Sequence, residues 1–334
     1  MNVLLTGGMG YIGSHVAVTL LQAGHRVILY DNLRNSEAGI LARIAKITGQ
    51  TPVFIQADIR ATKTLTDTLQ QHTVEAVLHF AGLKAVGESA QKPVEYYANN
   101  VEGTISLMQA MQEAEVRSLV FSSSATVYGE PRYLPLDEAH PLAATNPYGR
   151  SKLHIEEMLR DLSISDPLWR VISLRYFNPA GAHESGLLGE KPVAVPNNLM
   201  PYMARVATGE LKELSVFGND YPTPDGTGVR DYIHVMDLAE GHMAALFWLA
   251  EHPGWHTLNL GTGQGYSVLE MVAAFAKASG RAVPYRIAPR RKGDVAACYA
   301  DPEKARRELG WQARRDLAEM CASAWKFQKQ LQTG

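Results

Sequence analysis

The sequence predicts an α/β protein: a doubly wound parallel sheet in the first half and a smaller C-terminal α/β domain in the second. In the first half, short runs rich in Val, Leu and Ile alternate with longer stretches of helical period, which is typical of βαβ units. A glycine-rich turn follows the first apolar run directly. After Tyr176 the pattern loosens into segments rich in Pro, Asn and Gly, which indicates a loop-rich second domain.

The elements of the first half follow in chain order, and each helical stretch is long enough for the crossover that parallel strands require. We expect strands at Asn2–Thr6, Arg26–Tyr30, Pro52–Gln56, Ala76–Phe80, Ser118–Ser122 and Arg170–Arg175. We expect helices between them at Ile12–Ala23, Ala38–Thr48, Leu65–Gln71 and Gly103–Glu115.

In the second half, turn-rich segments separate fewer and shorter apolar runs. We expect loops at Glu190–Asn198 and Gly218–Gly228, strands at Thr257–Leu260 and Val283–Ile287, and helices at Leu199–Thr208, Val235–Leu249, Val268–Ser279, Pro302–Leu309 and Asp316–Leu331. Residues 1–177 are predicted to form the first domain and residues 178–334 mainly the second, with residues 230–262 returning to the first.

Composition narrows the class of protein. The chain has 334 residues, 46% of them hydrophobic, so it can bury a large core. A formal net charge of −2 gives no broad field, so we expect neither nucleic acid nor a membrane surface as a partner. With only Cys298 and Cys321, no charged leader and no long apolar run, the sequence predicts a cytoplasmic protein without a disulfide framework. No metal is expected, because Pro253 and Gly254 interrupt the helix that would align His252 with His256.

A glycine motif follows the first predicted strand. Gly7, Gly10 and Gly13 form a G-x-x-G-x-x-G pattern that opens the first predicted helix. Glycine lets the turn tighten and the backbone approach a pyrophosphate, and the helix N-terminus supplies free N–H groups to that anion. The motif predicts a Rossmann-type dinucleotide site, although an ordinary strand-to-helix turn is the alternative.

Polar and small residues end the next three predicted strands. Asp31 can accept hydrogen bonds from ribose hydroxyls and would repel a 2′-phosphate, which favours NAD over NADP, although Arg34 nearby leaves NADP open. Asp31 could instead cap the next helix. Asp58 occupies the matching position after the third strand, and the small residues of Phe80–Gly82 indicate another close backbone approach to the ligand.

Tyr148 and Lys152 form a Y-x-x-x-K pattern, which places both side chains on one face of a helix. A tyrosine with a pKa of about 10 is a poor base at neutral pH, so a nearby lysine and the positive nicotinamide would be needed to lower that pKa. Alone, the pattern usually means a solvated helix face. The serines Ser122 to Ser124 end the preceding strand and bring a hydroxyl to the same crevice, which favours hydride chemistry on a hydroxyl group.

These residues on this frame resemble the extended branch of the short-chain dehydrogenase/reductase superfamily, and longer blocks resemble the UDP-glucose 4-epimerases. The matching blocks span nearly the whole chain. They are TGGMGYIGSH at Thr6–His15, HFAGLKAVGES at His79–Ser89, FSSSATVYG at Phe121–Gly129, NPYGRSK at Asn146–Lys152, LRYFNPAGAH at Leu174–His183, PNNLMPY at Pro196–Tyr202 and FGNDYPTPDGTGVRDYIHVMDLA at Phe217–Ala239.

The resemblance implies an NAD-dependent epimerase of UDP-sugars. Tyr148 would take the proton from the sugar 4-hydroxyl while hydride passes to NAD, and the bound 4-ketose would rotate and take the hydride back on its other face. Ser124 would hydrogen-bond the 4-oxygen, and Lys152 would bind the nicotinamide ribose and help ionise Tyr148. NAD would stay bound throughout turnover.

By the same matching, each binding region is assigned residue by residue. The implied cofactor contacts are Gly7, Gly10, Tyr11, Ile12, Gly13, Asp31, Asn32, Leu33, Arg34, Asn35, Ser36, Asp58, Ile59, Phe80, Ala81, Gly82, Leu83, Lys84, Asn99, Ser122, Tyr148, Lys152 and Phe177. The implied substrate contacts are Ser124, Tyr148, Asn178, Asn198, Leu199, Phe217, Arg230, Tyr232, Arg291, Asp294 and Cys298. We expect Arg230 and Arg291 to lie in Gly/Asp-rich loops and to bind the diphosphate.

Some expectations remain open at this point. Cys298 stands where some family members carry a tyrosine, so we hypothesise room for the N-acetyl group of UDP-N-acetylglucosamine or UDP-N-acetylgalactosamine; an inert thiol is the alternative. Nucleotide-sugar dehydratases or decarboxylases are competing activities, but Ser124 is followed by Ala125 and Thr126 rather than by acids. An NAD-sensing protein without catalysis is a third possibility. The family also implies a homodimer through a helix pair that includes Gly103–Glu115.

Overall fold

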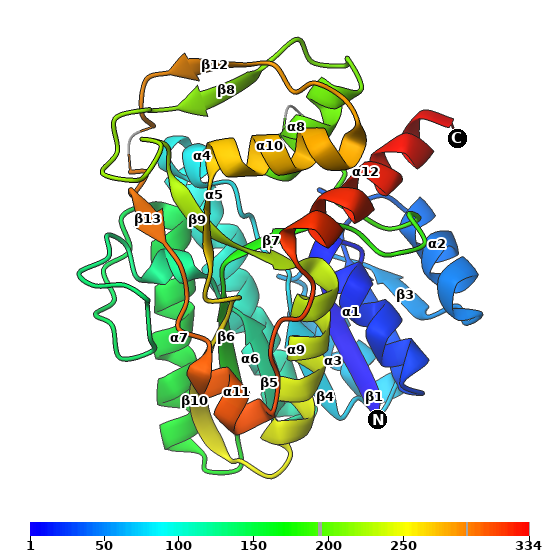
Figure 1. Cartoon of the computed structure of the whole chain (residues 1–334). Coiled ribbons are helices and arrows are strands. Elements are labelled where there is room, and N and C mark those ends of the chain that lie inside the picture. Colours follow the sequence, from blue (N-terminus) through cyan, green and yellow to red (C-terminus); the bar gives the residue numbers. More distant parts are fainter. Residues whose placement is uncertain (193–195, 292, 334) are drawn as a thin grey trace.

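A seven-stranded parallel sheet forms the centre of the molecule (Figure 1). The computed structural model describes residues 1–192, 196–291 and 293–333. In sheet order the strands are β10 (Gly254–Leu260), β6 (Arg170–Tyr176), β5 (Ser118–Ser122), β4 (Ala76–His79), β1 (Asn2–Thr6), β2 (Arg26–Asp31) and β3 (Val53–Gln56). Every pairing is parallel. The predicted doubly wound parallel sheet is therefore confirmed, and the order of strands reverses between β1 and β4.

Two apolar cores cover the two faces of this sheet. Val3 and Leu5 of β1 belong to one core and Leu4 to the other, because successive side chains of a strand point to opposite faces. Strands buried on both sides need continuous apolar runs, which explains why they are readily predicted. The first core contains helices α1 (Tyr11–Gln22), α2 (Gly39–Thr48), α9 (Val235–Leu249) and α11 (Glu303–Leu309); the second contains α3 (Thr62–Gln71), α6 (Gly103–Glu113) and α7 (Pro147–Ser165).

The second half contributes to both parts of the molecule. Strand β10 pairs with β6 at the edge of the large sheet, and α9 packs against α1. The division of the chain at residues 177 and 178 stays a prediction.

A smaller unit lies above the carboxyl ends of the large sheet (Figure 1). In it β9 (Val229–His234) pairs with β7 (Asn178–Ala180), β11 (Gly265–Ser267) and β13 (Ala297–Cys298), and β8 (Leu214–Phe217) pairs with β12 (Tyr285–Ala288). Helices α8 (Leu199–Ala207), α10 (Val268–Ser279) and α12 (Leu317–Thr333) share one core with β7, β8, β9 and β11.

The predicted helices and strands are present, some with the same bounds and the rest with ends displaced by at most three residues. Strands β7, β8, β9, β11 and β13, the short helices α4 (Val86–Gln91) and α5 (Pro93–Tyr97), the π-helical turn η1 (Ala98–Glu102) and the 3₁₀ turn η2 (Ala125–Val127) were not predicted. Most of them are too short to show a periodic pattern. Strands β8 and β9 are as long as strands that were predicted, but β9 carries the charged residues Arg230 and Asp231 in place of a continuous apolar run. The predicted loop Gly218–Gly228 separates β8 from β9, and part of the predicted loop Glu190–Asn198 lies outside the described residues.

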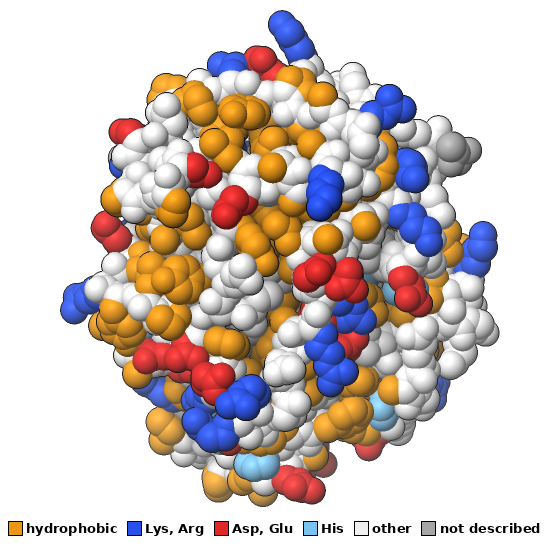
Figure 2. Space-filling model, viewed as in Figure 1, with side chains coloured by type: hydrophobic (Ala, Val, Ile, Leu, Met, Phe, Trp, Pro, Cys, Tyr) orange, Lys and Arg blue, Asp and Glu red, His pale blue; other side chains and the backbone are white. Residues whose placement is uncertain are grey.

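The surface carries no dominant charge on the face seen in Figure 2, where basic and acidic side chains are interspersed. Within the described ranges, none of the helices combines the length and the apolar character needed to span a bilayer.

Candidate active site

The glycine turn between β1 and α1 forms a cradle whose backbone is packed too tightly to accept side chains at Gly7 and Gly13. Gly7 has φ +67°, and a Cβ there would lie 2.6 Å from the backbone nitrogen of Ala81. A Cβ on Gly13 would lie 2.4 Å from the carbonyl oxygen of Gly7. Gly10 caps α1 without any side-chain hydrogen bond, so the N–H groups of the first helical turn face the cradle uncapped. This geometry fits a pyrophosphate at the helix N-terminus.

Asp31 ties the glycine turn to the loop after β2. Its carboxylate accepts hydrogen bonds from the backbone N–H groups of Met9 (3.1 Å) and Leu33 (2.8 Å) and from the hydroxyl of Ser36 (3.0 Å). Helix α2 is capped by Ala38 without a side-chain bond, so the alternative that Asp31 caps this helix is wrong. Asp31 therefore lies at the carboxyl end of β2 beside the glycine turn, and its contact with a ribose stays a prediction.

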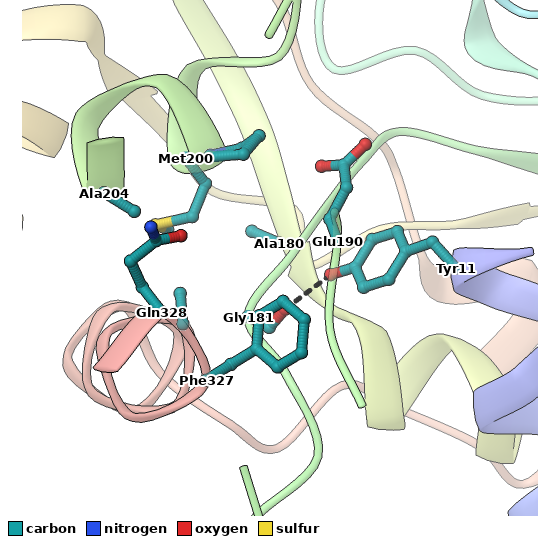
Figure 3. Close-up of a pocket in the computed structure, with 10 residues that line it drawn as sticks. Tyr11, Ala180, Gly181, Glu190, Met200, Ala204, Phe327 and Gln328 are labelled. Atoms are coloured by element: carbon teal, nitrogen blue, oxygen red, sulfur yellow. Dashed lines mark hydrogen bonds between the residues drawn. The ribbon is translucent and has the colours of Figure 1, made fainter. Parts of the chain in front are cut away.

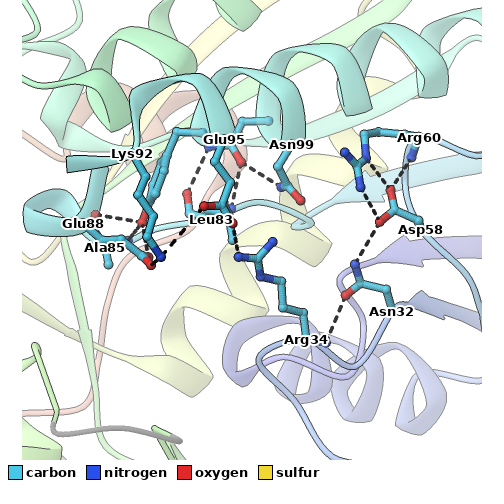
Figure 4. Close-up of polar contacts among 12 residues, drawn as sticks. Asn32, Arg34, Asp58, Arg60, Leu83, Ala85, Glu88, Lys92, Glu95 and Asn99 are labelled. Atoms are coloured by element: carbon cyan, nitrogen blue, oxygen red, sulfur yellow. Dashed lines mark hydrogen bonds and ion pairs between the residues drawn. The ribbon is translucent and has the colours of Figure 1, made fainter. Parts of the chain in front are cut away.

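The polar residues that follow β2 and β3 form hydrogen bonds and ion pairs with one another and with α5 (Figure 4). Asn32 donates to Asp58 over 3.2 Å, and Arg60 forms an ion pair with Asp58. Hydrogen bonds from Arg60 lower the pKa of Asp58 to about 2. Arg34 pairs with Glu95 on α5, so a carboxylate already balances the arginine that left NADP open.

The segment after β4, which carries Leu83 and Lys84, is fixed by Asn100 and Glu190, and neither residue was predicted from the sequence. The amide of Asn100 accepts from the N–H of Leu83 (2.8 Å) and donates to its carbonyl (3.0 Å). Glu190 accepts from both Lys84 (2.9 Å) and Asn198 (2.7 Å), and so links two predicted ligand residues. Asn100 adjoins the predicted Asn99 in the sequence, but no local pattern indicates Glu190.

A small pocket lies where α1 meets the second unit (Figure 3). Its lining includes Tyr11, Glu190 and Phe327, and the Tyr11 hydroxyl donates to the carbonyl of Gly181 over 2.7 Å. This bond joins the start of the predicted cofactor helix to the chain that leaves β7.

Helix α7 carries the predicted tyrosine and lysine. Asn146 caps its N-terminus by accepting from the N–H of Gly149, which starts the helix just before Tyr148. Tyr148 and Lys152 lie one turn apart and are 7% and 4% exposed, so the alternative of a solvated helix face is wrong. Ser124, two residues beyond the end of β5, is 8% exposed and lies close enough to Tyr148 to lower the pKa of its hydroxyl. The structure thus brings the three predicted catalytic residues into one buried site.

Burial governs the charges of this site. It raises the pKa of Tyr148 well above its usual value, whereas Ser124 and the positive charge of Lys84 act to lower it. Lys84 is thus a cation in the protein chain that acts on Tyr148, and the expected role of Lys152 in ionising Tyr148 stays a prediction. Lys152 donates to the carbonyl of Ser122 over 2.7 Å, and burial lowers its pKa to about 8.

Three short strands gather part of the predicted substrate site. Asn178 of β7 is in register with Tyr232 of β9, and Cys298 of β13 is in register with Arg230 of β9. Arg230 lies in a strand, so its expected position in a Gly/Asp-rich loop is wrong: pairing with β13 and β11 extends the backbone there. The Cys298 side chain is half-buried, and burial raises the pKa of its thiol to about 11.

The remaining predicted residues lie in separate groups. Arg291 places its guanidinium 3.8 Å from the centre of the Phe217 ring, and the N–H of Asp294 donates to the Arg291 carbonyl. Asn198 and Leu199 begin α8. Phe177 is buried between β6 and β7. In the part of the chain that the structure describes, no group of three or more His, Cys, Asp and Glu side chains is arranged to bind a metal.

Comparison with known proteins agrees with this geometry. The family model described as GDP-mannose 4,6 dehydratase matches residues 4–324. A UDP-glucose 4-epimerase of Bacillus subtilis is 58% identical, over 98% of this chain and 97% of the relative. The crystal structure of a UDP-glucose 4-epimerase from Stenotrophomonas maltophila, with bound NAD and formylated UDP-arabinopyranose, is 54% identical with a TM-score of 0.98, over 100% of this chain and 99% of that one.

A second solved structure gives the same result. The UDP-glucose 4-epimerase from Bifidobacterium longum, in complex with NAD+ and UDP, is 51% identical with a TM-score of 0.96, over 99% of this chain and 98% of that one. Identity of this extent over the full length, together with the buried serine, tyrosine and lysine beside a glycine turn, assigns the chain to the UDP-glucose 4-epimerase family.

Proposed function

We propose that this enzyme interconverts UDP-galactose and UDP-glucose with NAD as its resident cofactor. The carrying observation is the buried group of Ser124, Tyr148 and Lys152 at the carboxyl end of β5. This edge of a doubly wound sheet is where such folds bind their ligands. The sugar 4-hydroxyl would be oxidised to a ketone and then reduced on the opposite face.

The residues present fit NAD. The cradle formed by Gly7, Gly10 and Gly13 fits a pyrophosphate, because glycine allows the turn to be tight and leaves the N–H groups of the helix N-terminus open to the anion. Asp31 uses three hydrogen bonds to hold its own loop, and a carboxylate has about four acceptor positions, so one remains for a ribose hydroxyl. When bound, NAD supplies the acceptor and the donor of the hydride at carbon 4.

Tyr148 moves the proton. Because burial raises its pKa, Tyr148 holds its proton in the protein chain and needs nearby positive charge to act as a base. Lys84, whose charge lowers the Tyr148 pKa, and Lys152, one helical turn after Tyr148, would supply that positive charge. Ser124 would hydrogen-bond the oxygen on carbon 4 of the sugar, which Tyr148 deprotonates. The same tyrosine returns its proton when the ketone is reduced.

The nucleotide sugar would lie between the two units. Arg230 and Arg291 are the donors for the diphosphate, and Asn178, Asn198 and Tyr232 give polar contacts from the strands and the helix around them. Cys298 is in register with Arg230 across β9 and β13. Because its side chain is smaller than the tyrosine of some family members, it would leave space beside the sugar for an N-acetyl group. We therefore include UDP-N-acetylglucosamine and UDP-N-acetylgalactosamine among the substrates.

The functional unit would be a homodimer. Helices α6 and α7 form a surface groove lined by Ile105, Met108, Met158 and Leu162. Ile105 is 40% exposed, which favours a self-complementary contact between two copies of this helix pair. The two cysteines are free thiols, which fits the reducing cytoplasm.

Two other functions have less support. A dehydratase or decarboxylase needs further acid–base residues, and the turn after Ser124 starts with Ala125 and Thr126. A protein that only senses NAD has no need for the buried Tyr148 and Lys152.

The test is turnover of UDP-galactose by the purified protein without added NAD, followed as formation of UDP-glucose. Tyr148→Phe should abolish it, and Tyr133→Phe, which changes an exposed tyrosine, should not. Absence of turnover by the wild-type protein even after NAD is added would reject this function in favour of the two alternatives.

A further inference from the structure

Each of the three serines at the end of β5 is anchored by a different side chain. The hydroxyl of Ser122 bonds to His242 of α9 (3.0 Å), and that of Ser123 donates to Glu156 of α7 (2.5 Å). Ser124 accepts from the hydroxyl of Thr126 (3.0 Å) and from its backbone N–H (3.2 Å). The end of β5 is therefore fixed from both faces of the sheet. This strand end carries Ser124 and the Ser122 carbonyl that binds Lys152.

Glu156 is the one anchor that carries a negative charge. Its side chain is 1% exposed and accepts three hydrogen bonds from Arg175 of β6, the shortest of 2.6 Å. Arg175 also donates to the hydroxyl of Tyr128, which donates to Asn259. A buried carboxylate is costly unless it is paired and hydrogen-bonded, and here every oxygen is bonded.

Glu156 lies one helical turn beyond Lys152 on α7, on the same face. The Lys152 ammonium also lies 4.7 Å from the centre of the Phe121 ring on β5. Burial favours loss of the proton from Lys152, and attraction to Glu156 is the influence that opposes it and raises the pKa.

The other titratable groups near Lys152 and Glu156 do not supply a negative charge that could keep Lys152 protonated. His79 of β4 is kept neutral by burial, which lowers its pKa to about 3. Tyr148 on α7 holds its proton, as does Tyr128 beside Arg175, because burial raises both pKa values. Among these side chains, Glu156 is the one whose negative charge can attract the Lys152 ammonium.

We propose that Glu156 is a positioning residue of the epimerase: its carboxylate, fixed by Ser123 and Arg175, keeps Lys152 protonated and bound to the Ser122 carbonyl. Lys152 can then stabilise the ionised form of Tyr148. The inference rests on the proposed function, because it assigns Glu156 a role in that reaction. A buried ion pair that serves the fold alone is the competing explanation.

The test is the dependence of kcat on pH with UDP-galactose as substrate. Glu156→Gln keeps an oxygen acceptor for Ser123 but removes the charge, so Lys152 should lose its proton at lower pH. The alkaline limb of the profile should move down by about one pH unit, while KM for UDP-galactose changes by less than about twofold. Glu156→Asp, which retains a carboxylate, should move the alkaline limb at least part of the way back to the wild-type pH.

Two further variants separate charge from folding. Ser123→Ala removes a hydrogen bond but leaves the carboxylate, and its alkaline limb should stay at the wild-type pH. Glu156→Leu combined with Arg175→Leu removes both buried charges, so it leaves no unpaired arginine and can fold even if Glu156→Gln does not. Its alkaline limb should remain shifted.

A wild-type alkaline limb in Glu156→Gln, or in the folded double variant, would overturn the inference, as would a full shift in Ser123→Ala. The two proposals fail separately. Wild-type protein without turnover refutes the epimerase function, whereas an active wild type with an unshifted Glu156→Gln variant refutes only the role of Glu156.

Discussion

Four buried histidines should make the folded state sensitive to acid. His15, His79, His234 and His242 are each at most 3% exposed. Burial lowers their pKa values to about 4, 3, 3 and 4. His242 shows how the neutral form is held: one ring nitrogen bonds to the Leu238 carbonyl and the other to the Ser122 hydroxyl, so Nδ1 donates and Nε2 accepts.

The sign of the effect follows from proton linkage. Above pH 6.5, the usual histidine pKa, neither state binds a proton at these rings. Below it the unfolded chain takes up protons while the folded state does not, so the free energy of unfolding falls until the pH reaches the folded pKa values. Between pH 7.5 and pH 5 the loss is about 2 kcal/mol for each ring. Four rings lose about 8 kcal/mol, which is comparable with the whole stability of a typical domain, about 5–15 kcal/mol.

The assay is urea unfolding, followed by circular dichroism at half-unit steps from pH 7.5 to pH 5. His242→Asn keeps a donor toward Leu238 but has no titrating ring, so the slope of stability against pH should fall by about a quarter. His154→Asn, at an exposed position of α7, is the control and should keep the full slope. Stability that is flat down to pH 5, or a His242→Asn slope equal to that of the wild type, would refute the reasoning.

Three further predictions concern the cofactor, the sugar and the assembly. Gly13→Ala places a Cβ 2.4 Å from the Gly7 carbonyl, so the NAD retained after gel filtration should fall at least tenfold; Gly39→Ala, which meets nothing within 4 Å, should retain it. Cys298→Tyr should fill the space beside the sugar and reduce turnover of UDP-N-acetylgalactosamine about tenfold or more, with UDP-galactose turnover as the internal control. Ile105→Asp puts a charge into the apolar groove, so sedimentation should change from a dimer to a 36.6 kDa monomer.

Each of these has a contrary outcome. Full retention of NAD by Gly13→Ala would show that the cradle does not hold the pyrophosphate. Equal losses with both sugars in Cys298→Tyr would place the N-acetyl group elsewhere. A sedimentation coefficient that is the same for Ile105→Asp and the wild type would exclude the groove as the dimer contact.

The sequence determined the features that depend on neighbouring residues. Strand β1, the glycine turn and α1 were predicted within a residue, because an apolar run, the need for glycine and a helical period are local properties. The spacing of Tyr148 and Lys152 on one face of α7 is equally local. Full-length resemblance then identified the chemistry.

Only the tertiary structure decided which distant polar groups meet. Glu156 and Arg175, Glu190 with Lys84, and Arg34 with Glu95 are paired across separate elements, and nothing in the residues beside them indicates the partner. The position of Arg230 in β9 was also decided there, because a short strand forms only where another backbone supplies its hydrogen bonds. The periodicity of the sequence specifies which face of a helix or strand is buried. How the helices and strands are aligned with one another decides which charged side chains meet in a site.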